Sequence, residues 1–240
     1  MTGWRRPGMI AALLLVAALV LFLWPRGPGP IAPREPGAQP TLMLMTSLPI
    51  MFGESFGLEG NGSAALTALE KRYRVVPIEV ADAASLKHGK LLLMAHASAQ
   101  PAEALVDLDA WVRSGGRLML LADPALEWPS ERPLGDKLRP APMFMDTGLL
   151  AHWGLKLEAP AERGPVMQTL AGMEIETASP GRLSGDCTIG KDALVARCTI
   201  GKGQVTVIAD ADFLDLEHLD GPTDRNLDAL LAELASLESS

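Results

Sequence analysis

Two almost wholly apolar segments, KLLLMAH at residues 90–96 and RLMLLAD at 117–123, constrain the fold of this 240-residue chain most strongly. The segment between them, PAEALVDLDAWVRSGG at 101–116, begins with proline, repeats apolar residues at helical intervals and ends in two glycines, which predicts a helix. Consecutive strands that are joined by a helix and apolar on both faces are typical of a parallel sheet covered on both sides. We therefore predict an α/β domain with three layers.

The same alternation continues on either side of this unit. Strands are expected at 41–46, 74–80 and 155–159, and helices at 63–73, 145–154 and 223–237. The proline inside 74–80 predicts an edge strand, because proline cannot donate to a sheet ladder. Between residues 165 and 209, short segments with glycine turns predict an antiparallel C-terminal portion: MEIETAS, RLSGDCTIG, ALVARCTIG and QVTVIAD. The helix at 101–116 is expected to bury Leu105, Leu108, Trp111 and Val112.

An unbroken apolar run, MIAALLLVAALVLFLW, occupies residues 9–24. A helix of this length spans roughly 24 Å at ~1.5 Å per residue, slightly less than the ~30 Å of a bilayer core. Arg5 and Arg6 precede the run, and the positive-inside bias then favours a cytoplasmic N-terminus. A cleaved signal peptide is the alternative, but no A-x-A-like site follows, and the proline-rich PRGPGPIAP stands in its place.

These features divide the chain into a cytoplasmic N-terminus at 1–8, a transmembrane anchor at 9–24, a Pro/Gly-rich stalk at 25–40 and an extracytoplasmic α/β domain at 41–240. Proline favours extended polyproline II backbone, so the stalk is expected to be semi-rigid and to hold the domain away from the bilayer. We expect a single-pass protein of the cytoplasmic (inner) membrane, attached through residues 9–24, with its C-terminal domain in the periplasm.

Charge is distributed unevenly along the chain. Residues 1–40 carry four arginines and one glutamate, a net charge of +3, so the total of −8 leaves −11 on the remainder. A domain this acidic repels phosphate backbones, which excludes nucleic acid as the expected partner.

Cys187 and Cys198 are the only cysteines, and they flank TIGKDALVAR. If Asp192 and Ala193 form the centre of a hairpin turn, the two cysteines face each other across the strands at a separation that a disulfide can span. An oxidising compartment favours that disulfide. The alternative is two free buried thiols in a hairpin shifted by one residue.

Polar residues that follow apolar strands are the candidates for a site. His96 ends the strand at 90–96, and Asp123 ends the strand at 117–123. Asp210 is the last residue of QVTVIAD, and Asp212 follows it in the sequence IADADFLD, which also contains Asp215. Ligands of parallel α/β sheets bind at this carboxyl edge. Strand-end acids also commonly cap the next turn or helix, and structural roles are the expectation here. No histidine pair has metal-ligand spacing, so we expect no metal and no cofactor.

Several of these segments together resemble one family. LMTSLPIMFGES, LLLMAH with LDAWVRSGGRLMLLADP, and GKGQVTVIADADFLD with TDRNLDALLAEL resemble the periplasmic domains of gliding-motility-type ABC transporter accessory proteins and related uncharacterised domains. The resemblance covers residues 41–235 and implies a fold similar to class I glutamine amidotransferases. In those enzymes the strand matching RLMLLADP leads into an elbow that carries a nucleophilic cysteine. Here Ala122, Asp123 and Pro124 occupy that place, so the resemblance implies the fold without the chemistry.

The sequence therefore favours a membrane-anchored, non-catalytic extracytoplasmic domain. Its expected role is as an auxiliary or ligand-sensing component of an ABC-type transport or envelope system, with a transporter membrane subunit as partner. His96, Asp123, Asp210 and Asp212 are its candidate ligand-binding residues. The alternatives are a purely structural envelope scaffold, which would have no polar cleft, and an envelope hydrolase that acts on a glycan or peptide through Asp123, His96 and the 210–215 acids. An enzyme would need these groups to converge in one cleft.

The anchor makes a topological prediction. Alkaline phosphatase fused after residue 240 should be active, because residues 9–24 would leave the C-terminus outside the cytoplasm. The measurement is phosphatase activity in intact cells. Activity of a reporter that functions only in the cytoplasm, fused at the same point, would contradict the predicted orientation.

Overall fold

A computed structural model describes residues 29–51 and 62–240. No helix within these two ranges combines the length and the apolar character needed to cross a membrane. The predicted anchor at 9–24 lies outside the described residues.

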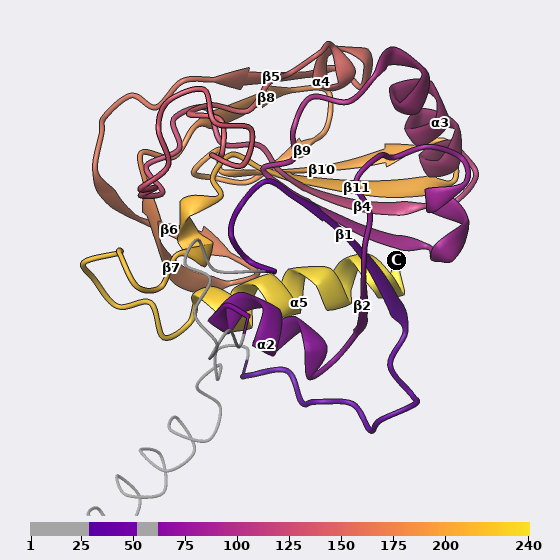
Figure 1. Ribbon diagram of the computed structural model, residues 1–240, viewed down its shortest axis with the longest axis horizontal. Coiled ribbons are helices and arrows are strands. Elements are labelled where there is room, and N and C mark those ends of the chain that lie inside the picture. Colours follow the sequence, from indigo (N-terminus) through magenta and orange to yellow (C-terminus); the bar gives the residue numbers. More distant parts are fainter. Residues whose placement is uncertain (1–28, 52–61) are drawn as a thin grey trace, which may run out of the picture.

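A seven-stranded sheet forms the centre of the domain, with strand order β2-β1-β3-β4-β11-β10-β9. The first five strands in this order are parallel, whereas β10 is antiparallel to both β11 and β9. The bounds are β1 Thr41–Thr46, β2 Arg74–Pro77, β3 Leu91–Ala95, β4 Arg117–Leu121, β9 Thr188–Ile189, β10 Val195–Ile200 and β11 Gly203–Ile208. The predicted α/β domain with a parallel sheet is confirmed (Figure 1).

The apolar composition of each strand matches its place in this sheet. Every residue of β3 is buried, and β4 is buried from Leu118 onward, because both strands lie in the interior of the sheet with helices on either side. The strand β2 is an edge strand, as its proline predicts, and it ends at Pro77.

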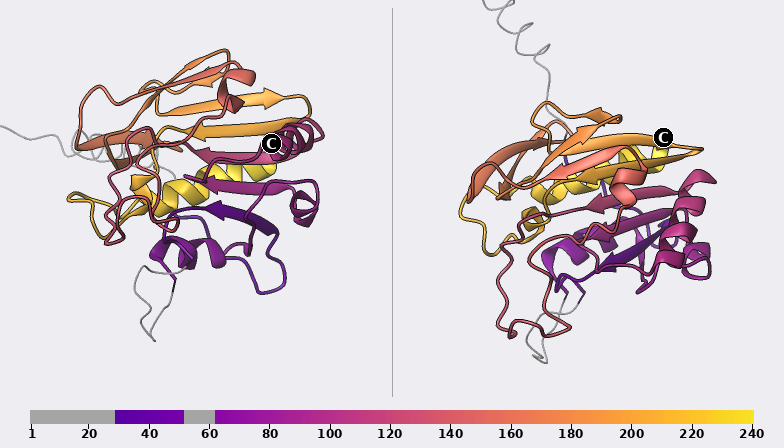
Figure 2. Two further views of the ribbon diagram at one scale, coloured as in Figure 1. Left: turned by 45° about the horizontal axis from the view of Figure 1, so that its top comes forward. Right: turned by 90° about the horizontal axis from the view of Figure 1, so that it is seen from above.

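Helices cover both faces of the sheet. The helices α2 (Ala64–Glu70) and α5 (Asn226–Ser239) lie on one face, and α3 (Ala102–Arg113), α4 (Leu149–His152) and the short 3-10 helix η1 (Ser85–His88) lie on the other (Figures 1 and 2). Each face contributes its own apolar cluster, the first around α5 and the second around α3. The structure therefore has the three layers that the strand pattern predicts.

Two small antiparallel pairs lie outside the main sheet. The strands β5 (Leu155–Glu158) and β8 (Arg182–Gly185) form one, and β6 (Pro165–Leu170) and β7 (Met173–Ala178) form the other. One expectation needs correction here. The segment QVTVIAD, assigned to the antiparallel portion, forms β11, which pairs in parallel with β4 and antiparallel with β10. The glycine turn before β11 indicates its pairing with β10, whereas the pairing with β4 joins residues 87 positions apart, such as Arg117 and Gln204.

The buried face of α3 also differs from the expectation. Leu108 and Val112 are buried as predicted, but Leu105 and Trp111 are only partly buried, and Ala104 takes a buried position instead. The Trp111 ring lies over Gly116, where an added Cβ would be 2.4 Å from the ring carbon Cε3. The tryptophan therefore covers the end of the helix, and Gly116 is needed because a side chain there would collide with the ring.

The described part of the expected stalk packs against the domain. Arg34 pairs with Glu238 at 2.9 Å and lies over the Tyr73 ring, and the carbonyl of Ala32 accepts a hydrogen bond from Arg72. The side chain of Gln39 donates to the carbonyl of Glu70. Residues 32–39 are therefore attached to α2 and to the end of α5 rather than extended away from the domain as a free spacer.

The hairpin of β9 and β10 has the predicted register. Ile189 pairs with Ala196 and Thr188 with Arg197, which places Cys187 opposite Cys198. The two cysteines are joined in the structure, with Cα atoms 4.8 Å apart. The disulfide fastens the antiparallel edge of the main sheet, where β9 has only two residues of its own in the ladder.

Reduction of this disulfide should destabilise the domain without unfolding it at room temperature. A closed loop with a sequence separation of 11 contributes about 2–3 kcal/mol through the entropy of the unfolded chain. We expect Cys187→Ser/Cys198→Ser to lower the free energy of unfolding in urea by about that amount. Labelling of both cysteines in denatured, unreduced protein would contradict the bridge.

Candidate functional site

The predicted site residues follow three neighbouring parallel strands. His96 follows β3, Asp123 lies two residues beyond β4, and Asp210 lies two residues beyond β11. Asp212 begins the 3-10 helix η2 (Asp212–Leu214). Because β3, β4 and β11 are adjacent and parallel, these residues all reach the carboxyl edge of the sheet.

Three carboxyl groups converge at this edge. One oxygen from each of Asp123, Asp210 and Asp212 lies within 4.8 Å of the other two. All three side chains are buried, with exposed fractions of 0%, 0% and 2%. Within residues 29–51 and 62–240, this is the one group of three or more His, Cys, Asp or Glu side chains arranged closely enough to share a metal ion.

Backbone N–H groups hold the first two carboxylates in place. The oxygens of Asp123 accept from Ala125 and from Ala211, both at 2.8 Å. Those of Asp210 accept from Phe213 at 2.8 Å and from Ala178 at 3.2 Å. These bonds connect the segments after β4 and β11 and the last residue of β7, so the carboxylates have the turn-capping role that strand-end acids often have.

Asp212 differs from the other two acids. Its Oδ2 accepts from the backbone N–H of Glu127 at 2.8 Å. Its Oδ1 is closed off from solvent and has no hydrogen-bond partner in the structure. A buried carboxylate oxygen without a partner is energetically costly, and such an atom requires an explanation.

The environment favours the protonated forms of all three acids. Burial, together with the charge of Glu127, raises the pKa of Asp123 to about 6, although hydrogen bonds from the backbone act in the opposite direction. Burial and the charge of Asp123 raise the pKa of Asp212 to about 8. The pKa of Asp210 is raised well above its usual range by burial and by the charges of its two neighbours.

His96 does not join this cluster. Its Nε2 lies 2.8 Å from the carbonyl oxygen of Ala141, which can only accept, so Nε2 carries the proton and Nδ1 is left with a lone pair. Nδ1 is buried and has no partner. Burial lowers the pKa of the imidazole, which keeps it neutral. With φ of 46°, the residue also turns the chain after β3 in the left-handed region.

The comparison of Asp123 with a nucleophile elbow is wrong in its local structure. An elbow requires a strand, a sharp turn and then a helix. Residues 122–148, which follow β4, contain neither helix nor strand. His96, after β3, is in the left-handed region, whereas Asp123 is not.

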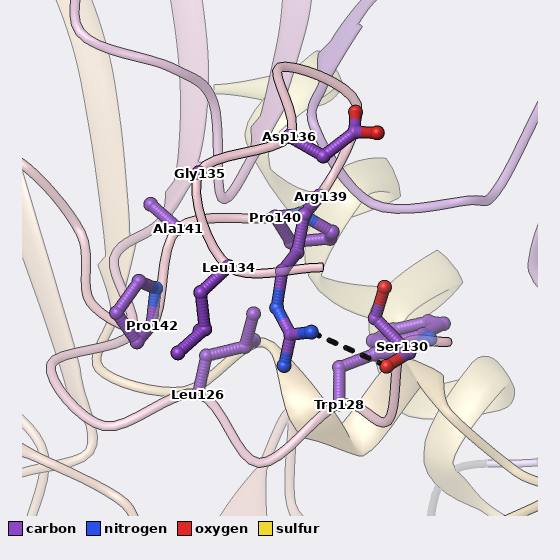
Figure 3. A pocket seen from close by; sticks show the side chains of 10 residues that line it. All are labelled: Leu126, Trp128, Ser130, Leu134, Gly135, Asp136, Arg139, Pro140, Ala141 and Pro142. Atoms are coloured by element: carbon purple, nitrogen blue, oxygen red, sulfur yellow. Dashed lines mark hydrogen bonds between the residues drawn. The ribbon is translucent and has the colours of Figure 1, made fainter. Parts of the chain in front are cut away.

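The long loop after β4 forms a pocket of about 290 Å³ at the same edge of the sheet. Two backbone hydrogen bonds close its base, from Leu126 to the carbonyl of Pro142 and from Phe144 to that of Asp123. The guanidinium of Arg139 points toward Ser130 and donates to its carbonyl (Figure 3). The lining residues are Leu126, Trp128, Ser130, Leu134, Gly135, Asp136, Arg139, Pro140, Ala141 and Pro142.

Sequence reasoning did not anticipate this pocket. The prolines mark the segment as irregular, and nothing in its local pattern indicates that its two ends meet. The structure connects it to the candidate residues, because Ala141 lines the pocket and its carbonyl accepts from His96. His96 thus supports the pocket wall, while the three acids lie behind the loop. The role of these four residues in ligand binding stays a prediction.

Comparisons with known proteins give no family assignment. No protein-family model matches the chain, and no curated protein matches its sequence. Among solved structures, exo-β-1,4-mannosidase Op5Man5 from Opitutaceae bacterium strain TAV5 is similar at 14% identity and a TM-score of 0.48, over 83% of this chain and 36% of that one. A β-galactosidase from Bacillus circulans sp. alkalophilus is similar at 12% identity and a TM-score of 0.45, over 83% and 31%. This chain thus spans about a third of the length of these enzymes.

A third similar structure is of comparable size. The cytoplasmic protein STM1381 from Salmonella typhimurium LT2 matches at 14% identity and a TM-score of 0.47, over 82% of this chain and 99% of that one. At such identities and TM-scores, none of these similarities carries an argument about the activity of this chain.

The raised pKa of Asp212 predicts that stability falls as the pH rises from about 7 to about 8, the upper end of the range over which this acid loses its contribution. Its folded-state value of about 8 lies above the ordinary 3.8, so the folded protein retains a proton that the unfolded chain has released. The stability that this proton contributes is fully present below pH 4 and is lost as the pH rises through about 8. Because the pKa of His96 is lowered, its titration makes the stability rise with pH, but only below about pH 6.5, which is outside this range.

The measurement is urea unfolding of the domain at several pH values in the presence of a chelator. Asp212→Asn should reduce the decrease of the free energy of unfolding with pH, because the amide cannot titrate. A free energy of unfolding that increases from about pH 7 to about pH 8 would contradict the prediction.

Proposed function

We propose that this chain is a membrane-anchored extracytoplasmic domain that binds a ligand in the pocket formed by residues 126–142 and performs no chemistry on it. The observation that carries the proposal is that the pocket is accessible, whereas the acids beside it are buried. The loop after β4 encloses about 290 Å³ of accessible space. The carboxylates and the imidazole that could act as catalysts are at most 2% exposed and face the backbone of the protein itself.

The chemistry of the pocket suits a ligand with both apolar and polar parts. Leu126, Leu134 and Trp128 contribute apolar surface, and Asp136 and Arg139 contribute opposite charges. Pockets that combine apolar walls with a few polar groups are the usual form of small-molecule sites. A sensing or auxiliary domain needs this kind of reversible binding and requires no activated nucleophile.

The finer assignment rests on the sequence. The resemblance to periplasmic domains of ABC transporter accessory proteins supports an amidotransferase-like fold that has lost the cysteine nucleophile. The apolar run at 9–24 and the arginines before it support an anchor with its N-terminus inside. A partner in the membrane, such as a transporter subunit, would then lie close to the domain.

An envelope hydrolase is the second candidate, and the convergence of the acids favours it. Carboxyl groups of glycosidases that retain configuration are about 5–5.5 Å apart, and one of them has a raised pKa. The oxygens of Asp123, Asp210 and Asp212 lie slightly closer together, and their pKa values are raised. A hydrolase would require the loop after β4 to open, because the acids are buried in this structure.

Two exposed leucines of the same loop separate these functions. Leu134 lines the pocket and is 85% exposed, whereas Leu138 is 66% exposed and does not line it. We expect Leu134→Asp to abolish complementation of a deletion strain, because a charge in the pocket disfavours an apolar ligand group. Leu138→Asp should complement normally. Both variants should be as abundant as the wild type by immunoblotting, since neither side chain is part of the core.

Asp123→Asn provides the test of the hydrolase. The amide retains an oxygen that can accept from a backbone N–H but cannot act as a base. The binding proposal expects this variant, once shown to be folded and normally abundant, to complement. Loss of complementation by Asp123→Asn, with Leu134→Asp unaffected, would overturn the binding proposal and favour the enzyme.

A further inference from the structure

The cluster of Asp123, Asp210 and Asp212 contains an unsatisfied atom. The side chain of Asp212 is only 2% exposed, and its Oδ2 is hydrogen-bonded. Its Oδ1 is buried and has no hydrogen-bond partner. The remaining four oxygens of the cluster each accept a backbone N–H. A carboxylate oxygen has two lone pairs, so these bonds leave every oxygen able to accept once more.

The cluster also lacks a compensating charge. The charged neighbours that shift the pKa values of Asp123 and Asp212 are acids, among them Glu127 and Asp215. Glu127 itself pairs at 3.7 Å with Arg163, an arginine that is largely exposed. Buried charges in proteins are paired or coordinate metals. A cation bound among the three acids would displace the protons that burial favours and would compensate the charges of the carboxylates.

The separation of the oxygens indicates the size of that cation. Two oxygens bound to one Ca²⁺ at about 2.3–2.6 Å are at most about 5 Å apart, whereas the limit for Mg²⁺ is about 4.2 Å. The three oxygens of the cluster lie within 4.8 Å of one another, which is inside the limit for Ca²⁺. Three carboxylates offer six oxygens, the lower limit of the six to eight that Ca²⁺ takes.

We propose that Asp123, Asp210 and Asp212 bind a divalent cation of the size of calcium, with Asp212 Oδ1 as one of its ligands. The ion joins the segments after β4 and β11 and fixes the start of the loop that forms the pocket. This role is separate from ligand binding in the pocket, since the ion lies among buried side chains and the pocket is open. The proposal therefore stands if the binding proposal fails, and the reverse also holds.

Thermal unfolding of the full chain, purified in mild detergent, tests the site with CaCl₂ as the probe. Extracellular calcium modules bind in the range of about 0.1–1 mM, so about 5 mM is near saturation. We expect the midpoint of unfolding to rise by roughly 2–8 °C relative to chelator-treated protein. Magnesium at the same concentration should give less than half of this shift. Equilibrium dialysis with radioactive calcium measures the binding directly and should give one ion per chain.

Two variants locate the effect. Asp212→Asn should lose the calcium shift and the bound calcium, while Glu176→Gln should keep both. Glu176 is a matched control, because it is a buried acid that accepts a backbone N–H from Gly221 and is not part of the cluster. No bound calcium in the wild type, an unchanged shift in Asp212→Asn, a lost shift in Glu176→Gln, or an equal response to magnesium would each overturn the proposal.

Discussion

The interactions that stabilise buried carboxyl groups at the carboxyl edge of the sheet determine how the loops at that edge are placed. Asp123 and Asp210 follow two adjacent parallel strands, where the geometry of the sheet brings them together. Their charges are costly in the interior, and backbone N–H groups from three separate segments offset that cost. The conformation of the loop after β4 depends on this arrangement, because the loop begins at Asp123 and returns to its carbonyl through Phe144. The pocket is thus a consequence of the same interactions that stabilise the acids.

The same arrangement limits the access of a substrate to the three acids. Catalytic carboxylates need a raised pKa and access to a substrate. In Asp123 and Asp212 the pKa is raised by burial, which also removes access. His96 follows the same principle, since its Nε2 proton is committed to the carbonyl of Ala141. A shifted pKa therefore does not by itself distinguish a catalytic group from a buried group that stabilises the fold.

Local patterns predict much of the fold, and they do not reveal the contacts that depend on distant segments. The apolar runs at β3 and β4, the proline in β2 and the cysteine hairpin each depend on a few neighbouring residues, and each is where the pattern places it. The parallel pairing of β11 with β4 connects distant parts of the chain and has no local signal. For the site, the sequence indicates which acids reach the edge, but their mutual distance and the partnerless oxygen of Asp212 follow only from the packed structure.

Residues 32–39 join the domain at the edge of the sheet opposite the pocket. Arg34 pairs with Glu238 near the C-terminus, and the C-terminal residue Ser240 accepts from Arg117 at the start of β4. The chain thus enters, and ends, beside the amino ends of the parallel strands. The attachment of residues 32–39 and the candidate site therefore lie at opposite ends of the parallel strands. The segment 32–39 is thus fixed to the core of the domain by these contacts, so its orientation follows that of the sheet.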